Sequence, residues 1–184
     1  MTLFQLIKSD YLKHKNYGGN FFTIVFLTQG FWATFQYRIA HFCHIKIKWK
    51  PLRIIVFIPL YFWQKMLEIV AGISIPPPAT IGHSFYVGHY GGIFLSPKVV
   101  IGNNCNIGQG VSIGVSGLDE NRGIPVIGNN VFIGVNTVVA GNIVIEDDVL
   151  IGASSLMITS AAKNSVYLGV PAVKISEKSS KGYI

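Results

Sequence analysis

The C-terminal half of the chain repeats a six-residue unit. Each unit begins with Ile or Val, and the twelve starting positions are Ile75, Ile81, Val87, Ile93, Ile101, Ile107, Ile113, Ile127, Ile133, Val139, Ile145 and Ile151. Because Ile and Val together make up roughly a quarter of the residues, an unbroken set of twelve is far outside chance. This repeat constrains the fold more strongly than any other feature of the sequence.

A six-residue unit corresponds to one short strand followed by a corner. The β-branched first residue points inward, a small fifth residue lets the corner close, and Gly or Asn supplies the turn backbone. Three units close a triangular coil, and coils stack at about the 4.8 Å spacing of neighbouring strands. The sequence therefore predicts a mainly β protein, a left-handed parallel β-helix of about four coils over 75–92, 93–112, 113–138 and 139–156.

Two steps in the repeat are longer than six residues. Eight residues separate Ile93 from Ile101, and fourteen separate Ile113 from Ile127. Because the packed interior has no room for extra residues, we expect them to leave the prism, the longer step as an extruded loop over 115–125. Long loops on rigid scaffolds often carry function, so its polar residues are candidates for substrate binding: Asp119, Glu120, Asn121 and Arg122.

The first 73 residues differ from the repeat in period and in charge. They hold nine Lys and Arg against Asp10 and Glu68, a balance of 9 − 2 = +7, whereas residues 74–184 hold six of each sign. Apolar residues at three- and four-residue intervals predict helices over 21–41 and 53–71, with a break at Lys50-Pro51. We thus expect an N-terminal helical cap (1–73), the β-helix (74–162) and a C-terminal closure and tail (163–184).

The uneven charge argues against a nucleic-acid footprint over the whole surface and points to a local anionic partner. The longest apolar run, residues 54–63, contains Pro59 and falls short of the roughly 20 residues that a membrane span needs. We therefore expect a cytoplasmic protein, with peripheral contact between the basic cap and an anionic bilayer as one hypothesis. Packing of the cap's aromatic residues within an oligomer is the alternative.

Stacking of the coils predicts a column of residues along one vertical edge. The third residues of successive third units are His89, Gln109, Val135 and Ala153, and the extruded loop leaves the chain between Gln109 and Val135. His89 is therefore predicted to stand near a groove. His83, six residues earlier, falls on a different face.

The hexads and both longer steps of residues 75–157 resemble serine acetyltransferases unit for unit. Two further segments are similar to that family, Tyr37-Arg38-Ile39-Ala40-His41 and Gly169-Val170-Pro171-Ala172. The resemblance implies a homotrimeric, acetyl-CoA-dependent acyltransferase with sites between subunits, and His89 falls on the family's catalytic histidine. It also implies that pantetheine lies along the edge near Val135 and Ala153, and that Lys174 meets the phosphates.

Three positions depart from that family. Gly88 replaces its Asp before the histidine, Gly123-Ile124 replaces an Arg-His pair, and Ser74 replaces the Asp that pairs with the catalytic histidine. The pattern that remains, Gly88-His89-Tyr90-Gly91-Gly92 with a Gly-Ile-Pro-Val-Ile-Gly loop end, resembles acetyltransferases of capsule, exopolysaccharide and lipopolysaccharide assembly. That resemblance implies a sugar hydroxyl as acceptor, contacted by Tyr90 and the loop.

Other acceptors and another class stay open. Acetylation of a small acceptor, such as a nucleotide-linked amino sugar or L-serine, is the nearest enzymatic alternative. A metal-dependent hydratase on the same scaffold would need three convergent histidines, whereas this edge offers one.

Transfer of an acetyl group from a thioester to a hydroxyl needs a base and donors for the developing oxyanion. Imidazole is mostly neutral near pH 7 and accepts protons, so His89 is the predicted general base. A backbone N–H at Gly114 or Val115, near the base of the loop, is the predicted oxyanion donor. Cys105 occupies an inward fifth position and is no credible nucleophile. Acetyl-CoA is the expected donor, with Gln109 of the same edge included among its contacts, and no metal is expected.

Overall fold

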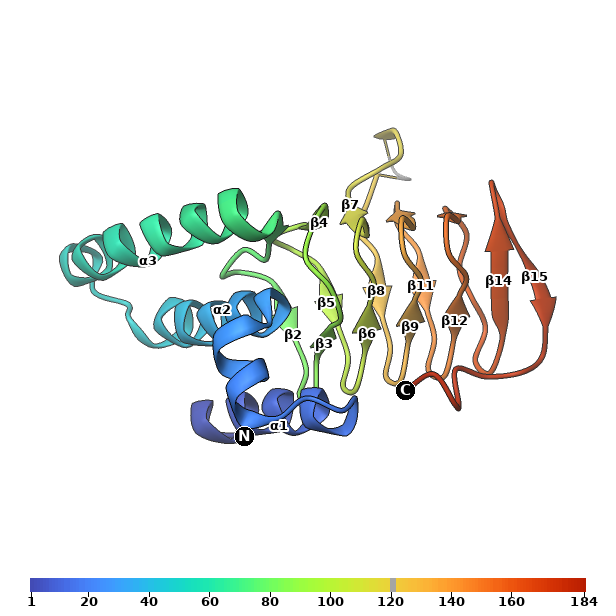
Figure 1. The fold of residues 1–184 in the computed structure, drawn as a ribbon. Coiled ribbons are helices and arrows are strands. Elements are labelled where there is room, and N and C mark those ends of the chain that lie inside the picture. The colour runs from blue at the N-terminus through green and yellow to red at the C-terminus, as the bar shows by residue number, and fades with distance from the viewer. Residues whose placement is uncertain (120–121) are drawn as a thin grey trace.

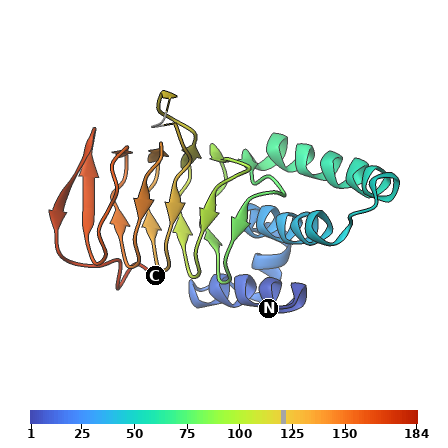
Figure 2. The same cartoon turned by 180° about the vertical axis from the view of Figure 1, so that it is seen from behind.

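The computed structural model describes residues 1–119 and 122–184. Helices gather at one end of a long stack of short strands, as Figures 1 and 2 show from opposite sides. The helical elements are α1 (Leu3–Asn16), the π-helix η1 (Thr23–Leu27), α2 (Gln29–Lys46) and α3 (Lys50–Ala71). α1 begins with a capping box, in which Thr2 and Gln5 each accept a hydrogen bond from the other's backbone N–H.

The helix expected over residues 21–41 is interrupted, and that prediction was wrong in its extent. Thr28 has an extended backbone, and its hydroxyl donates to the Thr23 carbonyl. The indole of Trp32 donates to the Val25 carbonyl, 2.7 Å away, which holds η1 against the start of α2. α3 begins at Lys50 rather than at Arg53. Pro51 is tolerated in the first turn because N–H groups there have no partner within the helix.

The strands form three sheets, one for each face of a triangular prism. Sheet A consists of β1 (Ile73–Ser74), β4 (Ile93–Leu95), β7 (Ser112–Gly114), β10 (Val138–Ala140) and β13 (Leu156–Met157). Sheet B consists of β2 (Thr80–Ile81), β5 (Val100–Ile101), β8 (Val126–Ile127) and β11 (Val144–Ile145). Sheet C consists of β3 (Tyr86–Val87), β6 (Asn106–Ile107), β9 (Phe132–Ile133), β12 (Leu150–Ile151), β14 (Val166–Gly169) and β15 (Ala172–Ser176).

Successive strands of the chain move from sheet to sheet, and pairing within each sheet is parallel until β14 meets β15 antiparallel. This arrangement confirms the predicted parallel β-helix. All twelve unit-starting residues are buried, with exposed fractions of 0–5%. Small fifth residues are buried beside them, including Ala79, Cys105 and Thr137.

The eight-residue step lies elsewhere than the sequence predicted. Leu95, and not Ile93, pairs with Ile113, which in turn pairs with Val139. The extra two residues therefore lie between Val87 and Leu95, and the first coil runs over 75–94. Because Ile93 and Leu95 both point inward from β4, either could be counted as the start of a unit. The two extra residues therefore enlarge the corner that carries His89.

Glycine serves a different purpose in the units than the sequence suggested. All second-position glycines except Gly88 and Gly114 lie against the next coil: a Cβ on Gly102 would stand 2.5 Å from the Gly128 carbonyl oxygen. The left-handed backbone belongs to the fourth position instead, where Asn104, Asn130 and Asn136 have φ of 57°, 54° and 56°. Close stacking of coils thus explains the Gly repeat, and the corner turn explains the Asn repeat.

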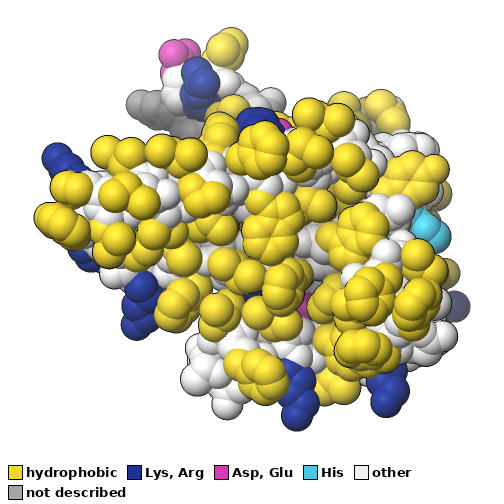
Figure 3. All heavy atoms as spheres, turned by 60° about the vertical axis from the view of Figure 1, so that its left-hand side comes forward, with side chains coloured by type: hydrophobic (Ala, Val, Ile, Leu, Met, Phe, Trp, Pro, Cys, Tyr) yellow, Lys and Arg dark blue, Asp and Glu magenta, His cyan; other side chains and the backbone are white. Residues whose placement is uncertain are grey.

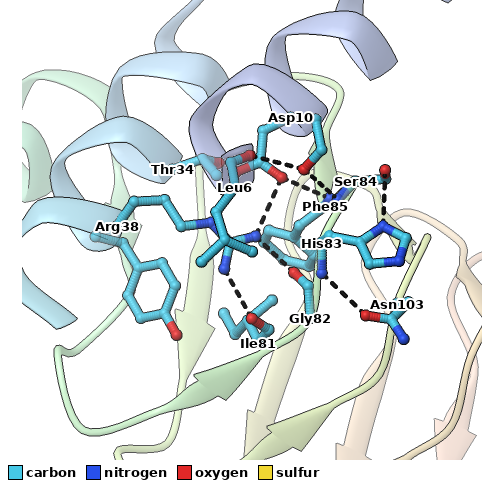
Figure 4. Close-up of polar contacts among 12 residues, drawn as sticks. Leu6, Asp10, Thr34, Arg38, Ile81, Gly82, His83, Ser84, Phe85 and Asn103 are labelled. Atoms are coloured by element: carbon cyan, nitrogen blue, oxygen red, sulfur yellow. Dashed lines mark hydrogen bonds and ion pairs between the residues drawn. The ribbon is translucent and has the colours of Figure 1, made fainter. Parts of the chain in front are cut away.

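A buried ion pair fixes the helices to the first coil. The Arg38 guanidinium of α2 donates to Asp10 of α1, and also to the backbone carbonyls of Ile81 and Gly82 (Figure 4). Asp10 in turn accepts the N–H of Phe85. Each hydrogen-bonding group of this buried pair has a partner, which is the condition under which a buried charge pair is tolerated.

Candidate functional site

The corner between sheets C and A carries His89. We call residues 88–93 the His89 corner; in the next coil, the same corner spans only residues 108–111, because Val87 pairs with Ile107 and Phe94 with Ser112. Two residues of the enlarged corner, Gly91 and Gly92, have φ of 99° and 66°, a backbone that favours glycine. The enlarged corner is also tied to the end of α3, because Gly91 and Ile93 donate to the carbonyls of Ala71 and Gly72.

His89 itself is exposed, and its imidazole makes no hydrogen bond to any residue that the structure describes. Tyr90 beside it is 64% exposed. Both ring nitrogens of His89 are thus open to an incoming ligand. An accessible imidazole on a rigid corner is suited to accepting a proton from a bound hydroxyl.

Register confirms the predicted stacking above His89. Val87, Ile107, Ile133 and Ile151 pair in sequence, and the residue two positions after each of them occupies the same corner. Backbone hydrogen bonds continue into the corner, from Asn136 N–H to the Gln109 carbonyl and from Ser154 N–H to the Val135 carbonyl, each 2.8 Å. Gln109, Val135 and Ala153 therefore form one column, with His89 at its foot in the enlarged corner, where the equivalent hydrogen bond runs from Gly110 N–H to the Gly91 carbonyl. The buried Gln109 Oε1 has no hydrogen-bond partner among the described residues.

The loop lies at another corner of the prism. It leaves sheet A after Gly114 and enters sheet B at Val126, whereas His89 lies between sheets C and A. Within one chain, sheet A separates His89 from the loop and from Gly114 and Val115. The loop therefore leaves the chain between Gln109 and Val135, as expected, but at a different corner of the prism from His89.

The loop has a closed base. Ser116 and Gly123 exchange two backbone hydrogen bonds, and Arg122 N–H donates to the Asp119 carbonyl. The side chains of Val115, Asp119 and Arg122 are exposed. The other two candidate loop residues, Glu120 and Asn121, lie outside the described residues. This closed base gives the loop a fixed direction away from the prism, visible at the upper edge of Figure 1.

Two of the positions that depart from the serine acetyltransferase pattern have clear structural settings. Ile124 packs against the hydrophobic core. Ser74, on sheet A, donates its hydroxyl hydrogen bond to Glu68 Oε1 over 2.8 Å. Partial burial would raise the pKa of Glu68, but hydrogen bonds from Lys65, Ser74 and Gln64 outweigh it and lower that pKa. A carboxylate of α3 thus stands beside Ser74.

Sequence reasoning missed Glu68. Its contact with Ser74 crosses from a helix to a strand six residues later, around the left-handed Gly72. No periodicity reports such a contact. The closest signal is the glycine itself, since a C-terminal glycine ends a helix and turns the chain back.

The remaining candidates are placed as follows. Lys174, on β15, pairs across the strand with Tyr167 and forms an ion pair of 2.8 Å with Glu177. Cys105 points inward, and burial raises the pKa of its thiol to about 12, so the thiolate is unfavourable near neutral pH. His83 lies at the corner between sheets B and C and contacts the Ser84 hydroxyl. Among residues 1–119 and 122–184 there is no group of three His, Cys, Asp or Glu arranged to hold a metal.

Two family descriptions match parts of the repeat. Residues 124–158 match "Bacterial transferase hexapeptide (six repeats)", and residues 98–116 match "Hexapeptide repeat of succinyl-transferase". The serine acetyltransferase of Staphylococcus xylosus is 34% identical over 142 residues, and that of Staphylococcus epidermidis is 31% identical over the same length. The alignments cover 77% of this chain but only 62% and 63% of those proteins.

Solved structures give the same answer for the fold. A serine acetyltransferase in complex with CoA has a TM-score of 0.78 at 26% identity, covering 94% of this chain and 69% of that one. The chain is thus similar to serine acetyltransferases over most of its length and shares their fold. The serine acetyltransferase of Neisseria gonorrhoeae, also 26% identical, has a TM-score of 0.79 over 95% of this chain and 66% of its own. This similarity includes a left-handed β-helix and a helical N-terminal region.

Proposed function

We propose that this protein is an acetyl-CoA-dependent O-acetyltransferase in which His89 is the general base. The observation that carries the proposal is the open imidazole of His89 on an enlarged corner, at the foot of the column formed by Gln109, Val135 and Ala153. Similarity to a structure named for its CoA complex supports acetyl-CoA as the donor. The alignment covers only 62% of the first curated relative, so the activity needs a direct test.

The oxygen of the acceptor hydroxyl attacks the thioester carbonyl, and His89 accepts the proton of that hydroxyl. A backbone N–H at Gly114 or Val115 stabilises the oxyanion of the tetrahedral intermediate. When the carbon–sulfur bond breaks, the His89 imidazolium returns the proton to the leaving thiolate, so the products are an acetyl ester and free CoA. Because Cys105 is buried and held as a thiol, transfer is direct and forms no acyl-enzyme.

The column supplies the donor site. Gln109 Oε1 accepts a hydrogen bond from an amide N–H of pantetheine, which gives this buried oxygen a partner. Val135 and Ala153 present small, apolar contacts along the same edge. Lys174 reaches the phosphates by exchanging its ion pair with Glu177 for one with the ligand.

The complete site lies between two subunits of a trimer. His89 and the loop occupy the two corners that flank sheet A, so three prisms with sheet A facing a common axis bring the His89 corner of one beside the loop of the next. Exposed apolar side chains on the outer face of sheet A, Phe94 and Val138, favour its burial in such an assembly. In the trimer, Gly114, Val115 and Tyr90 share one groove.

The first acceptor to test is L-serine. The curated relatives and the solved structures cited above are all named serine acetyltransferases, and they favour serine over the saccharide that the sequence motifs suggested. Glu68, beside Ser74, provides a carboxylate near the position where the family has Asp.

A saccharide hydroxyl is the second candidate acceptor. It is favoured by Ile124, whose side chain packs on the core where the serine acetyltransferase pattern has a histidine, and by Gly88 in place of an aspartate. An exposed Tyr90 offers a ring face to a sugar. The same reasoning covers nucleotide-linked amino sugars, in which an amine would take the acetyl group.

The deciding experiment measures CoA release from acetyl-CoA with a panel of acceptors: L-serine, nucleotide-linked amino sugars and neutral oligosaccharides. Mass spectrometry of the product identifies the acetylated atom. Serine turnover at ordinary enzyme rates supports the first acceptor, and turnover with saccharides alone supports the second. Absence of CoA release with every acceptor would count against acetyl transfer.

A further inference from the structure

The outward face of α3 is apolar along nearly its whole length. The structure describes all of residues 52–70 of α3. The exposed apolar side chains there include Ile55, Ile58, Phe62 and Ile69, which are 66–78% exposed. Lys65 is the single charged side chain on this face, and it is paired with Glu68. We call this surface the α3 apolar face; at 1.5 Å per residue it is about 27 Å long. Figure 3 shows hydrophobic side chains gathered over this helical end of the molecule.

The opposite side of α3 is held by the protein. Gln36 of α2 donates to the Leu60 carbonyl, Arg53 contacts His44 of α2 over 2.9 Å, and Glu68 binds Ser74 of sheet A. α3 is long and apolar enough to cross a membrane, with 17% of its most apolar window buried. Crossing would strip these polar partners from its inner side, whereas lying flat in a bilayer surface would leave them in place.

Positive charge gathers at the N-terminal end of the α3 apolar face. Lys46, Lys48 and Lys50 are exposed around the turn between α2 and α3, next to Trp49, which is 68% exposed. The two acidic residues of the helical segment, Asp10 and Glu68, are both engaged in ion pairs within the chain. The turn therefore presents cations, and an indole of the kind that settles at the level of lipid headgroups.

We propose that α3 docks in the surface of an anionic phospholipid bilayer, with its apolar face among the acyl chains and the turn lysines on the headgroups. Charge complementarity selects this occupant over a second copy of the chain. Two parallel copies meeting through this face would bring the same lysines together, and like charges in contact oppose association. An antiparallel pair would separate the lysines but would leave them without an anionic partner. The inference does not depend on acetyl transfer.

The test is co-sedimentation of the full chain with vesicles of phosphatidylglycerol and phosphatidylcholine in equal parts, at low salt. Binding is expected to these vesicles and to be much weaker to phosphatidylcholine alone. Replacing Lys46, Lys48 and Lys50 by Gln is expected to weaken binding about fivefold for each lysine. Ile55→Glu with Ile58→Glu is expected to weaken it about tenfold or more, because carboxylates oppose insertion of the apolar face.

A matched control is Ile175→Glu, which places one carboxylate on an exposed apolar site of β15 at the far end of the stack. It should bind vesicles as the unaltered chain does. Equal loss in this control, equal binding to neutral vesicles, or no binding at low salt would each overturn the proposal. So would a vesicle-free assembly that Ile58→Glu splits into smaller units, since a second copy would then cover the face.

Discussion

Arg38 and Asp10 face each other in the interior, where Nε and Oδ2 are 2.7 Å apart and both side chains are 1% exposed. This pair joins α1 and α2 to the first coil, because Arg38 also binds two carbonyls of that coil. The helical segment and the β-helix are thus connected through a charge pair as well as through apolar packing. Removing the cation of this pair should therefore lower the free energy of unfolding.

Arg38→Met should lower the free energy of unfolding by about 3–5 kcal/mol, because the carboxylate of Asp10 would stay buried without its cation. Urea denaturation monitored by circular dichroism measures this. Adding Asp10→Asn to that variant should recover part of the loss, since the amide still accepts the Phe85 N–H without a charge. A double variant as unstable as the single one would show that the buried charge is not the cause.

Burial lowers the pKa of His14 below its usual 6.5, and its contacts with Asp10 only partly offset this. Below pH 6.5, His14 therefore binds a proton in the unfolded chain but stays neutral in the folded chain until the pH falls to its lowered pKa. Stability from this group is complete above that pH and decreases as the pH falls toward the lowered value, by at most about 1.4 kcal/mol per pH unit. Urea unfolding from pH 7.5 to 5 should show the decrease, and His14→Phe should flatten it. An unchanged slope in that variant would remove His14 as the cause.

Gly134→Ala should destabilise the β-helix by about 1–3 kcal/mol, because its Cβ would stand 2.5 Å from the backbone N of Ala153 in the next coil. Gly114→Ala is the matched control: nothing lies within 4 Å of its Cβ position. Its effect should stay within about 0.5 kcal/mol. Thermal unfolding of both variants compares them, and equal losses would refute the stacking explanation for the Gly repeat.

His89→Ala should lower turnover by roughly 10²–10⁴ while leaving the free energy of unfolding nearly unchanged, since the side chain is exposed and bonded to no described residue. CoA release with the acceptor identified by the panel measures turnover. His83→Ala, at a different corner, should retain activity. Near-normal turnover of His89→Ala would eliminate it as the base.

Subunit mixing tests whether His89 and the loop of different chains complete one site. One partner carries His89→Ala, and the other has residues 117–122 replaced by an Asn-Gly turn, which suits the two-stranded base at Ser116 and Gly123. Neither should be active alone. Trimers of randomly mixed subunits should regain about a quarter of the sites, because only one neighbour order in four combines an intact His89 with an intact loop. Zero recovery in verified mixed trimers would place both elements in one subunit's site.

The sequence was sufficient to identify the unit-starting residues of the core outside β4, since a β-branched residue at a fixed period has few other uses. It could not place the eight-residue step, because Ile93 and Leu95 are both apolar and two residues apart on one strand. It also missed the break at Thr28, which depends on hydrogen bonds between side chains and backbone carbonyls rather than on apolar spacing.

For the site, the column above His89 followed from the period alone. The separation of His89 from the loop did not, because order along the chain reports which coil a residue belongs to, but not which corner of the triangle it occupies. Glu68 shows a further limit: its partner Ser74 is chosen by how α3 turns into β1, and that turn is set by contacts with the His89 corner.

The column sets a distance along the prism edge. Each coil adds about 4.8 Å, so Ala153, three coils above His89, lies about 14 Å from it. In the proposed site, a donor has to be long enough to reach from His89 to the coil that carries Ala153. A thioester shortened to acetyl-cysteamine would contact only the coil of His89. It would lose every contact that the upper coils provide.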